Sequence, residues 1–118
     1  MSPQTEISHT LLVFRGEQLR VRQHAIDRLI ERWPLYSRVP LTEETALLEL
    51  QRLLNQAEPE VIDPAHKVIR MINNGFREAS YWKLWPWRFV TTVDRDGVTT
   101  LLTAEIIVPN KRRKIKAP

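Results

Sequence analysis

Apolar residues recur every three to four positions in three stretches of the chain, the spacing of a helix with one buried face. The stretches cover roughly residues 23–33, 42–57 and 63–75. A proline follows the first, and Asp63-Pro64 gives the third a capping side chain and a first-turn proline. The pattern predicts three helices. The third is short and β-branched, so a strand over residues 68–72 stays open as an alternative.

Other segments carry the signals of strands and tight turns. Apolar residues on both sides of Gly16, within residues 11–22, predict a short hairpin. Residues 80–84, 87–94 and 98–108 are rich in Val, Ile, Thr and aromatic side chains. These last three segments predict a C-terminal β-meander.

The dipeptide Asp96-Gly97 predicts a two-residue hairpin turn that pairs Arg95 with Val98. One face of this hairpin is then apolar and meets the helices. It pairs Trp87 with Ile106, Phe89 with Ala104, Thr91 with Leu102 and Val93 with Thr100. The mixed, polar face pairs Arg88 with Glu105, Val90 with Thr103, Thr92 with Leu101 and Asp94 with Thr99. A slip of one residue would exchange the two faces.

Together the elements predict an α+β fold, with two or three helices packed on one face of a twisted antiparallel sheet. A chain of 118 residues fits one domain, which we place at residues 1–110. Residues 111–118 are expected to form a flexible basic tail. Of the aromatic residues, we expect Trp87 to be buried and either Trp82 or Trp85 to be exposed.

Composition narrows the class of protein. No apolar run approaches the roughly 18 residues that a membrane-spanning helix needs. The first ten residues are polar and unlike a signal peptide, so a cytoplasmic protein is expected. Without cysteine there is no thiolate zinc site, and the three histidines lack a metal-like spacing. We therefore expect neither metal nor cofactor.

The net charge of +4 is a property of the tail rather than of the domain. The tail holds five of the 18 Lys and Arg residues, which leaves 13 in the body against 14 Asp and Glu. The body is polarised, because residues 15–38 hold six arginines and three acids whereas residues 43–63 hold six acids and one arginine. The first of these regions suits a polyanion and the second does not.

The first helix carries the candidate chemistry. His24, Arg28 and Glu31 lie opposite its apolar stripe, with Arg32 at the margin. Histidine suits proton transfer near neutral pH, and arginine suits phosphate. A metal-independent ribonuclease needs both. The alternative interpretation is a solvated helix face with an Arg28–Glu31 pair.

Residues 23–32, Gln-His-Ala-Ile-Asp-Arg-Leu-Ile-Glu-Arg, resemble the His-Ala-x-x-Arg-x-x-Glu-Arg signature of small bacterial and phage proteins. These proteins are related to the RelE/BrnT-like toxin ribonucleases. The segments 87–90 and 99–103 are similar to a late strand pair of such proteins. The resemblance implies a RelE/BrnT-like fold with an RNA-cleaving or RNA-binding sheet face beside the helix. It matches His24 and Arg28 to the motif and adds Arg88 and Thr103 on the facing strands.

These observations predict a toxin-like, RNA-directed protein of bacterial or mobile-element origin, acting as a metal-independent endoribonuclease. His24 would be the general acid or base, Arg28 and Arg88 would hold phosphate, and Glu105 would orient groups or act as a base. Contacts to RNA are also expected from Arg32, Thr103, Lys111, Arg112, Arg113 and Lys114.

Two other functions stay open. One is a non-catalytic module that binds nucleic acid through the tail and the polar sheet face. The other is a protein-binding inhibitor or subunit that uses the acidic second helix and exposed tryptophans. The toxin-like function would include a protein partner such as an antitoxin. None of the three functions is expected to involve a membrane partner.

Overall fold

A computed structural model describes residues 10–73 and 78–107. Six strands form one sheet in the order β1-β2-β6-β5-β4-β3. The strands are β1 (Thr10–Phe14), β2 (Glu17–Val21), β3 (Glu58–Glu60), β4 (Ser80–Leu84), β5 (Trp87–Val93) and β6 (Thr99–Ile106). The helices are α1 (Gln23–Arg32), α2 (Glu43–Leu54) and α3 (Pro64–Asn73), with a 3-10 turn, η2 (Trp33–Leu35), after α1. The predicted α+β class and the β4-β5-β6 meander are confirmed.

The sheet is mixed, so the prediction of a purely antiparallel sheet is wrong. Strand β2 runs parallel to β6, and every other neighbouring pair is antiparallel. The chain leaves β2 through α1 and comes back to β6 only after α2, β3, α3, β4 and β5. It returns in the same direction as β2, and this orientation depends on the whole intervening topology.

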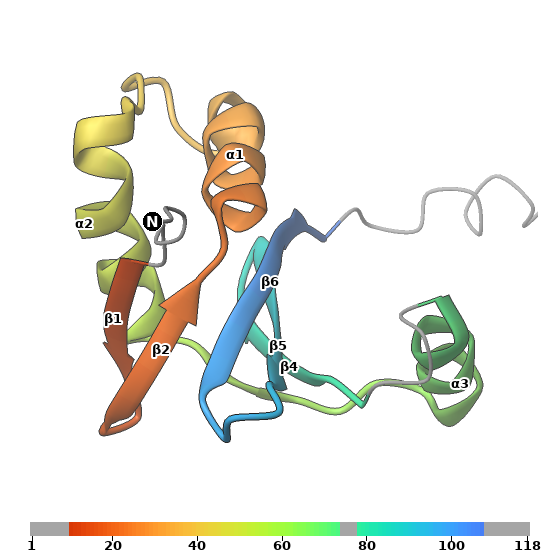
Figure 1. Ribbon diagram of the computed structural model, residues 1–118. Helices are drawn as coiled ribbons and strands as arrows, with labels where there is room; N and C mark the ends of the chain where they lie inside the picture. Colours follow the sequence, from red (N-terminus) through yellow and green to blue (C-terminus); the bar gives the residue numbers. More distant parts are fainter. Residues whose placement is uncertain (1–9, 74–77, 108–118) are drawn as a thin grey trace, which may run out of the picture.

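The core lies between the sheet and the helices α1 and α2, which cover the same face (Figure 1). From α1 it takes Ile26 and Leu29, as the apolar spacing predicts, and also Ala25. Trp33 follows in η2 and packs near Trp87, which is fully buried. The other core side chains include Leu19, Val21, Leu50, Leu53, Leu54, Phe89, Leu101 and Ala104.

The third predicted helix exists, and the alternative strand over residues 68–72 is wrong. α3 spans Pro64–Asn73, but none of its side chains is buried. It lies apart from the body, beyond the face that α1 and α2 leave open (Figure 1). The prediction that helices share one face of the sheet is therefore confirmed for two of the three. The dipeptide Asn74-Gly75, a typical sequence for the C-cap of a helix, lies outside the described residues.

The turn between β5 and β6 has three residues rather than the predicted two. The amide of Asp94 donates to the carbonyl oxygen of Val98 at 3.0 Å, and the amide of Gly97 donates to that of Asp94 at 2.9 Å. Gly97 has a φ of 84°, a conformation that favours glycine. This three-residue loop shifts the start of the ladder by one position.

A β-bulge restores the predicted register further along the hairpin. The four pairs farthest from the turn are as predicted: Trp87–Ile106, Arg88–Glu105, Phe89–Ala104 and Val90–Thr103. Nearer the turn the predicted pairs are wrong, and the structure pairs Thr91 with Leu101, Thr92 with Thr100 and Val93 with Thr99. The extra residue is Leu102. As a result Leu101 is buried in the core and Leu102 lies on the open face.

Candidate functional site

The position of α1 follows from the unequal lengths of β2 and β6. Strand β2 pairs only with Thr99–Leu101, so the rest of β6 has no strand on that side. α1 packs closely on β6. The Arg32 side chain donates from Nη1 to the carbonyl oxygen of Ala104 at 2.7 Å, which occupies an acceptor that a neighbouring strand would otherwise use. The helix therefore forms a wall beside the open face of β6.

His24, Arg28 and Arg32 recur every four residues and so share one side of α1. Two adjoining hollows of about 290 and 610 Å³ lie beside this side and share four lining residues. We call the combined hollow the α1–β6 groove. Its lining comprises Arg22, His24, Arg28, Arg32, Leu35, Arg70, Val90, Leu102, Thr103, Glu105 and Ile106. The structure thus brings together five of the residues predicted from sequence: His24, Arg28, Arg32, Thr103 and Glu105.

Glu105 is paired with two arginines from different elements. Arg70 of α3 donates to both carboxylate oxygens, each at 3.2 Å. The Nη1 atom of Arg88 lies 3.7 Å from Oε1 of the same carboxylate. A carboxylate held in this way orients guanidinium groups. Arg70 was not among the residues predicted from sequence, although it is one of two basic residues, with Lys67, that lie opposite the apolar stripe of their helix.

Arg88 makes its main contacts away from the groove. Its Nε and Nη2 atoms donate to the two oxygens of Glu60, both at 2.8 Å, and the two side chains are 20% and 14% exposed. The hydrogen bonds from Arg88 hold the pKa of Glu60 below its ordinary value, and Glu60 raises the pKa of Arg88 in return. Arg88 therefore joins β3 and β5, and its contact with Glu105 is the longer one. It is not part of the groove lining.

His24 and Arg28 are the accessible groups of the groove. His24 is exposed, and no described residue forms a hydrogen bond with its imidazole. Arg28 pairs with Glu31, as the alternative interpretation of the helix predicted, and both side chains are partly exposed to solvent. Exposed pairs of this kind contribute little to stability and exchange readily with other ions.

The groove has an excess of positive charge. Among its lining residues there are four arginines (Arg22, Arg28, Arg32 and Arg70) and one carboxylate, Glu105. Two of these cations also pair with acids outside the groove, Arg22 with Asp94 and Arg28 with Glu31, so the excess is moderate. The predicted basic residues Lys111, Arg112, Arg113 and Lys114 lie outside the described residues.

A second charged cluster on the open face has a structural role. Arg20 of β2 donates to Asp94 at 2.9 Å and to Asp96 at 2.7 Å, and the Thr100 hydroxyl also donates to Asp94. The hydrogen bond from Arg20 lowers the pKa of Asp96. The cluster links β2 to the turn between β5 and β6. The sequence pattern did not predict it.

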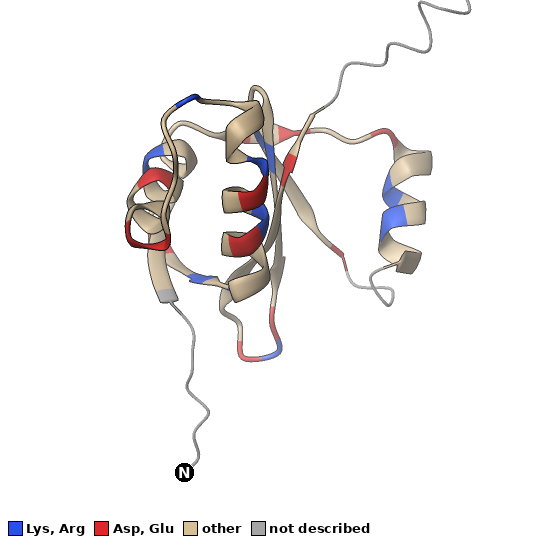
Figure 2. Ribbon diagram, turned by 90° about the horizontal axis from the view of Figure 1, so that it is seen from above, with Lys and Arg blue, Asp and Glu red and all other residues tan. Residues whose placement is uncertain are grey.

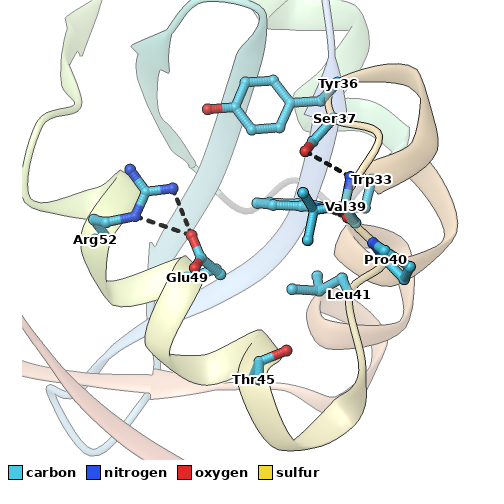
Figure 3. A pocket seen from close by; sticks show the side chains of 9 residues that line it. All are labelled: Trp33, Tyr36, Ser37, Val39, Pro40, Leu41, Thr45, Glu49 and Arg52. Carbon is cyan, nitrogen blue, oxygen red and sulfur yellow. Dashed lines mark hydrogen bonds and ion pairs between the residues drawn. The ribbon is translucent and has the colours of Figure 1, made fainter.

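A separate pocket of about 510 Å³ lies between α2 and the segment after α1 (Figure 3). Its polar groups are largely engaged with one another. The Trp33 indole donates to the carbonyl oxygen of Val39 at 2.8 Å, and Arg52 binds Glu49 through two nitrogens. Few groups are left to recognise a ligand, so we assign this pocket no role.

The tryptophans are placed as the sequence predicted. Trp87 is fully buried, whereas Trp85 is 57% exposed. Trp82 is half-buried, with the Arg15 guanidinium 5.0 Å from its ring centroid and its indole donating to Thr91. Trp82 is therefore committed to packing, and Trp85 is the tryptophan that a partner could reach.

No protein-family model, curated protein or solved structure matches this chain. The residues that the structure describes contain no cluster of three or more His, Asp or Glu side chains suited to a metal ion. Within the same residues, no helix combines the length and apolar character required to cross a membrane.

Proposed function

We propose that this chain is an RNA-directed, toxin-like protein with a RelE/BrnT-like fold, and that it cleaves RNA without a metal ion in the α1–β6 groove. The observation that carries the proposal is the common side of α1 formed by His24, Arg28 and Arg32, which faces Thr103 on β6 across a hollow. This side combines a proton-transfer group with two phosphate-binding groups at the spacing of successive helical turns.

The reaction assigned to the groove is transfer of the phosphoryl group to the neighbouring 2′-hydroxyl. The 2′-oxygen forms a bond to phosphorus, the bond from phosphorus to the 5′-oxygen breaks, and a 2′,3′-cyclic phosphate results. His24 accepts the proton of the 2′-hydroxyl, and the leaving 5′-oxygen takes a proton from water. Arg28 and Arg70 offset the negative charge that builds up on the phosphate oxygens.

Glu105 and Arg88 have positioning roles in this proposal. Because Arg70 and Arg88 already bind the Glu105 carboxylate, that group orients Arg70 toward the groove instead of accepting a proton. Arg88 supports Glu105 through the ion pair between its Nη1 atom and the Glu105 carboxylate. This assignment keeps the orienting role that the sequence suggested for Glu105, and it drops both the alternative role of Glu105 as a base and the phosphate-binding role of Arg88.

The direct test is cleavage of a single-stranded RNA in buffer that contains EDTA. His24→Ala should reduce the cleavage rate at least 100-fold, with 2′,3′-cyclic phosphate ends on the wild-type products. His66→Ala is the matched control, because His66 is an exposed histidine on α3 that does not line the groove. Intact RNA with the wild-type protein, or equal rates for the two variants, would refute the enzymatic proposal.

A non-catalytic RNA-binding module is the second candidate, and the single histidine of the groove favours it. The groove would then bind phosphates without a partner for proton transfer. Binding should weaken with salt, and Arg28→Gln should weaken it several-fold. His24→Ala should leave affinity unchanged in that case. Affinity without cleavage would therefore select this candidate over the enzyme.

A further inference from the structure

The β-bulge in the β5–β6 hairpin places two consecutive side chains in the α1–β6 groove. Successive residues of a regular strand point to opposite faces of a sheet. Here Leu102 and Thr103 both line the smaller hollow, because the bulge adds one residue to β6 between the buried Leu101 and Ala104. An apolar side chain and a hydroxyl group therefore lie next to each other on the open face of the sheet.

The floor of the smaller hollow is apolar. Val90 lines this hollow although it is only 3% exposed, and Leu102, the neighbour of its strand partner Thr103, is partly exposed. An apolar floor offers nothing to a phosphate, whereas a planar base gains free energy when one of its faces leaves water. The floor therefore fits a base better than it fits the backbone of a nucleic acid.

The rim of the same hollow is polar and mostly basic. Arg22 and His24 come from the start of α1, and Arg70 reaches the hollow from α3, which lies beyond the open face of the sheet (Figure 2). Among the described residues, none forms a hydrogen bond with the hydroxyl group of Thr103. A hydroxyl group both donates and accepts, so Thr103 can bind the polar edge of a base.

The two hollows of the groove meet at the proposed proton-transfer group. They share four lining residues, among them His24 and Thr103, and the larger hollow adds the phosphate-binding groups of Arg28 and Arg32. The smaller hollow measures about 290 Å³, at the lower end of the range for small-molecule sites. It has room for one base and not for a base pair. A ribose beside His24 carries its own base toward this hollow.

We propose that the smaller hollow is a subsite for one unpaired base, namely the base of the nucleotide whose 2′-hydroxyl lies at His24. Leu102 and Val90 contact the face of the base, and Thr103 binds its edge. This inference rests on the proposed RNA-directed function, since it adds a base to a groove whose larger hollow binds phosphate. It restricts the substrate to single-stranded regions, because a paired base has to leave its stack to enter the hollow.

Binding of an uncleavable strand tests the subsite separately from catalysis. The probe is a single strand of about ten nucleotides of mixed sequence without 2′-hydroxyls, and the comparison strand has the same phosphates but no bases. At constant salt and in EDTA, the wild type should bind the probe at least tenfold tighter than the abasic strand. Equal affinities for the two strands would overturn the subsite, even if the protein cleaves RNA.

Leu102→Ser tests where in the groove the base binds. Leu102 is not a core residue, and its replacement should make the two affinities equal. Leu11→Ser is the matched control and should keep the wild-type preference, because Leu11 is a half-exposed leucine of β1 that does not line the groove. A Leu102→Ser variant that keeps the full preference would overturn the subsite. Preference for bases without cleavage of RNA would support the subsite and refute only the enzymatic proposal.

Discussion

Helices α1 and α3 have the same length and the same kind of apolar stripe, yet the structure uses them in opposite ways. α1 buries Ala25, Ile26 and Leu29 against the sheet, whereas α3 buries no side chain. The two helices also differ in their tethers, the arginine side chains that link each helix to the sheet. Arg32 lies at the margin of the α1 stripe and binds β6. Arg70 lies opposite the α3 stripe and binds Glu105. Burial of apolar side chains orients α1, whereas α3 has no buried side chain and is held through Arg70.

The difference in burial between α1 and α3 is tested most directly by truncating one aliphatic side chain on each helix. Leu29→Ala should destabilise the protein by about 2–5 kcal/mol, because it leaves a cavity at a fully buried site. Ile69→Ala should cost less than about 1 kcal/mol in dilute solution, since its side chain is half exposed. Urea unfolding followed by tryptophan fluorescence measures both. Similar costs would show that α3 packs on the body after all.

The two tethers can be compared in the same way. Arg32→Met keeps the apolar stem but leaves the Ala104 carbonyl without its partner, and should lower stability by about 1–2 kcal/mol. Arg70→Met should release α3 while leaving the unfolding midpoint of the body nearly unchanged. Amide hydrogen exchange provides the readout, with α3 amides losing protection in the Arg70 variant alone. Global loss of protection in that variant would contradict the assigned role of the tether.

Sequence reasoning succeeded where local pattern decides the structure. The apolar spacing of residues 23–33 placed Ile26, Leu29 and Trp33 in the core, and it placed His24 and Arg28 together on the opposite side. Both results follow from helical geometry within a single element.

It failed where distant parts of the chain decide. Arg70 and Glu105 are 35 positions apart, so no local signal shows that they meet. The predicted hairpin missed two features that compensate for each other. The three-residue turn shifts the strand pairing by one residue, and the bulge at Leu102 shifts it back. The turn length and the bulge act together, because only their combination places Leu101 in the core and Thr103 on the open face. The residue propensities of Asp96-Gly97 do not show whether the turn has two residues or three.

The open face of the sheet should respond to acid more than the α1 side, because it is built from ion pairs. Hydrogen bonds from Arg88 lower the pKa of Glu60 below its ordinary value of 4.5. Their contribution is therefore complete above that value and is lost as the pH falls through the lower pKa of the folded state. Glu60→Gln should cost about 1–2 kcal/mol at pH 7 and flatten the decline of stability between about pH 5 and pH 3. Urea unfolding at several pH values tests this, and an unchanged slope would remove Glu60 as the source.

The smallest effect on stability is expected at the exposed pair on α1, where the effect on ligand binding should be larger. Glu31→Gln removes the partner of Arg28, and exposed pairs contribute only about 0–1 kcal/mol. The same change frees the Arg28 guanidinium and removes a negative charge beside the groove. RNA affinity at low salt should therefore rise a few-fold, with a steeper dependence on salt concentration. Asp27→Asn is the matched control, because Asp27 lies on the same helix, is bonded to Gln23 and does not line the groove. If both variants raise affinity equally, net charge alone explains the change, and Arg28 has no specific place in the groove.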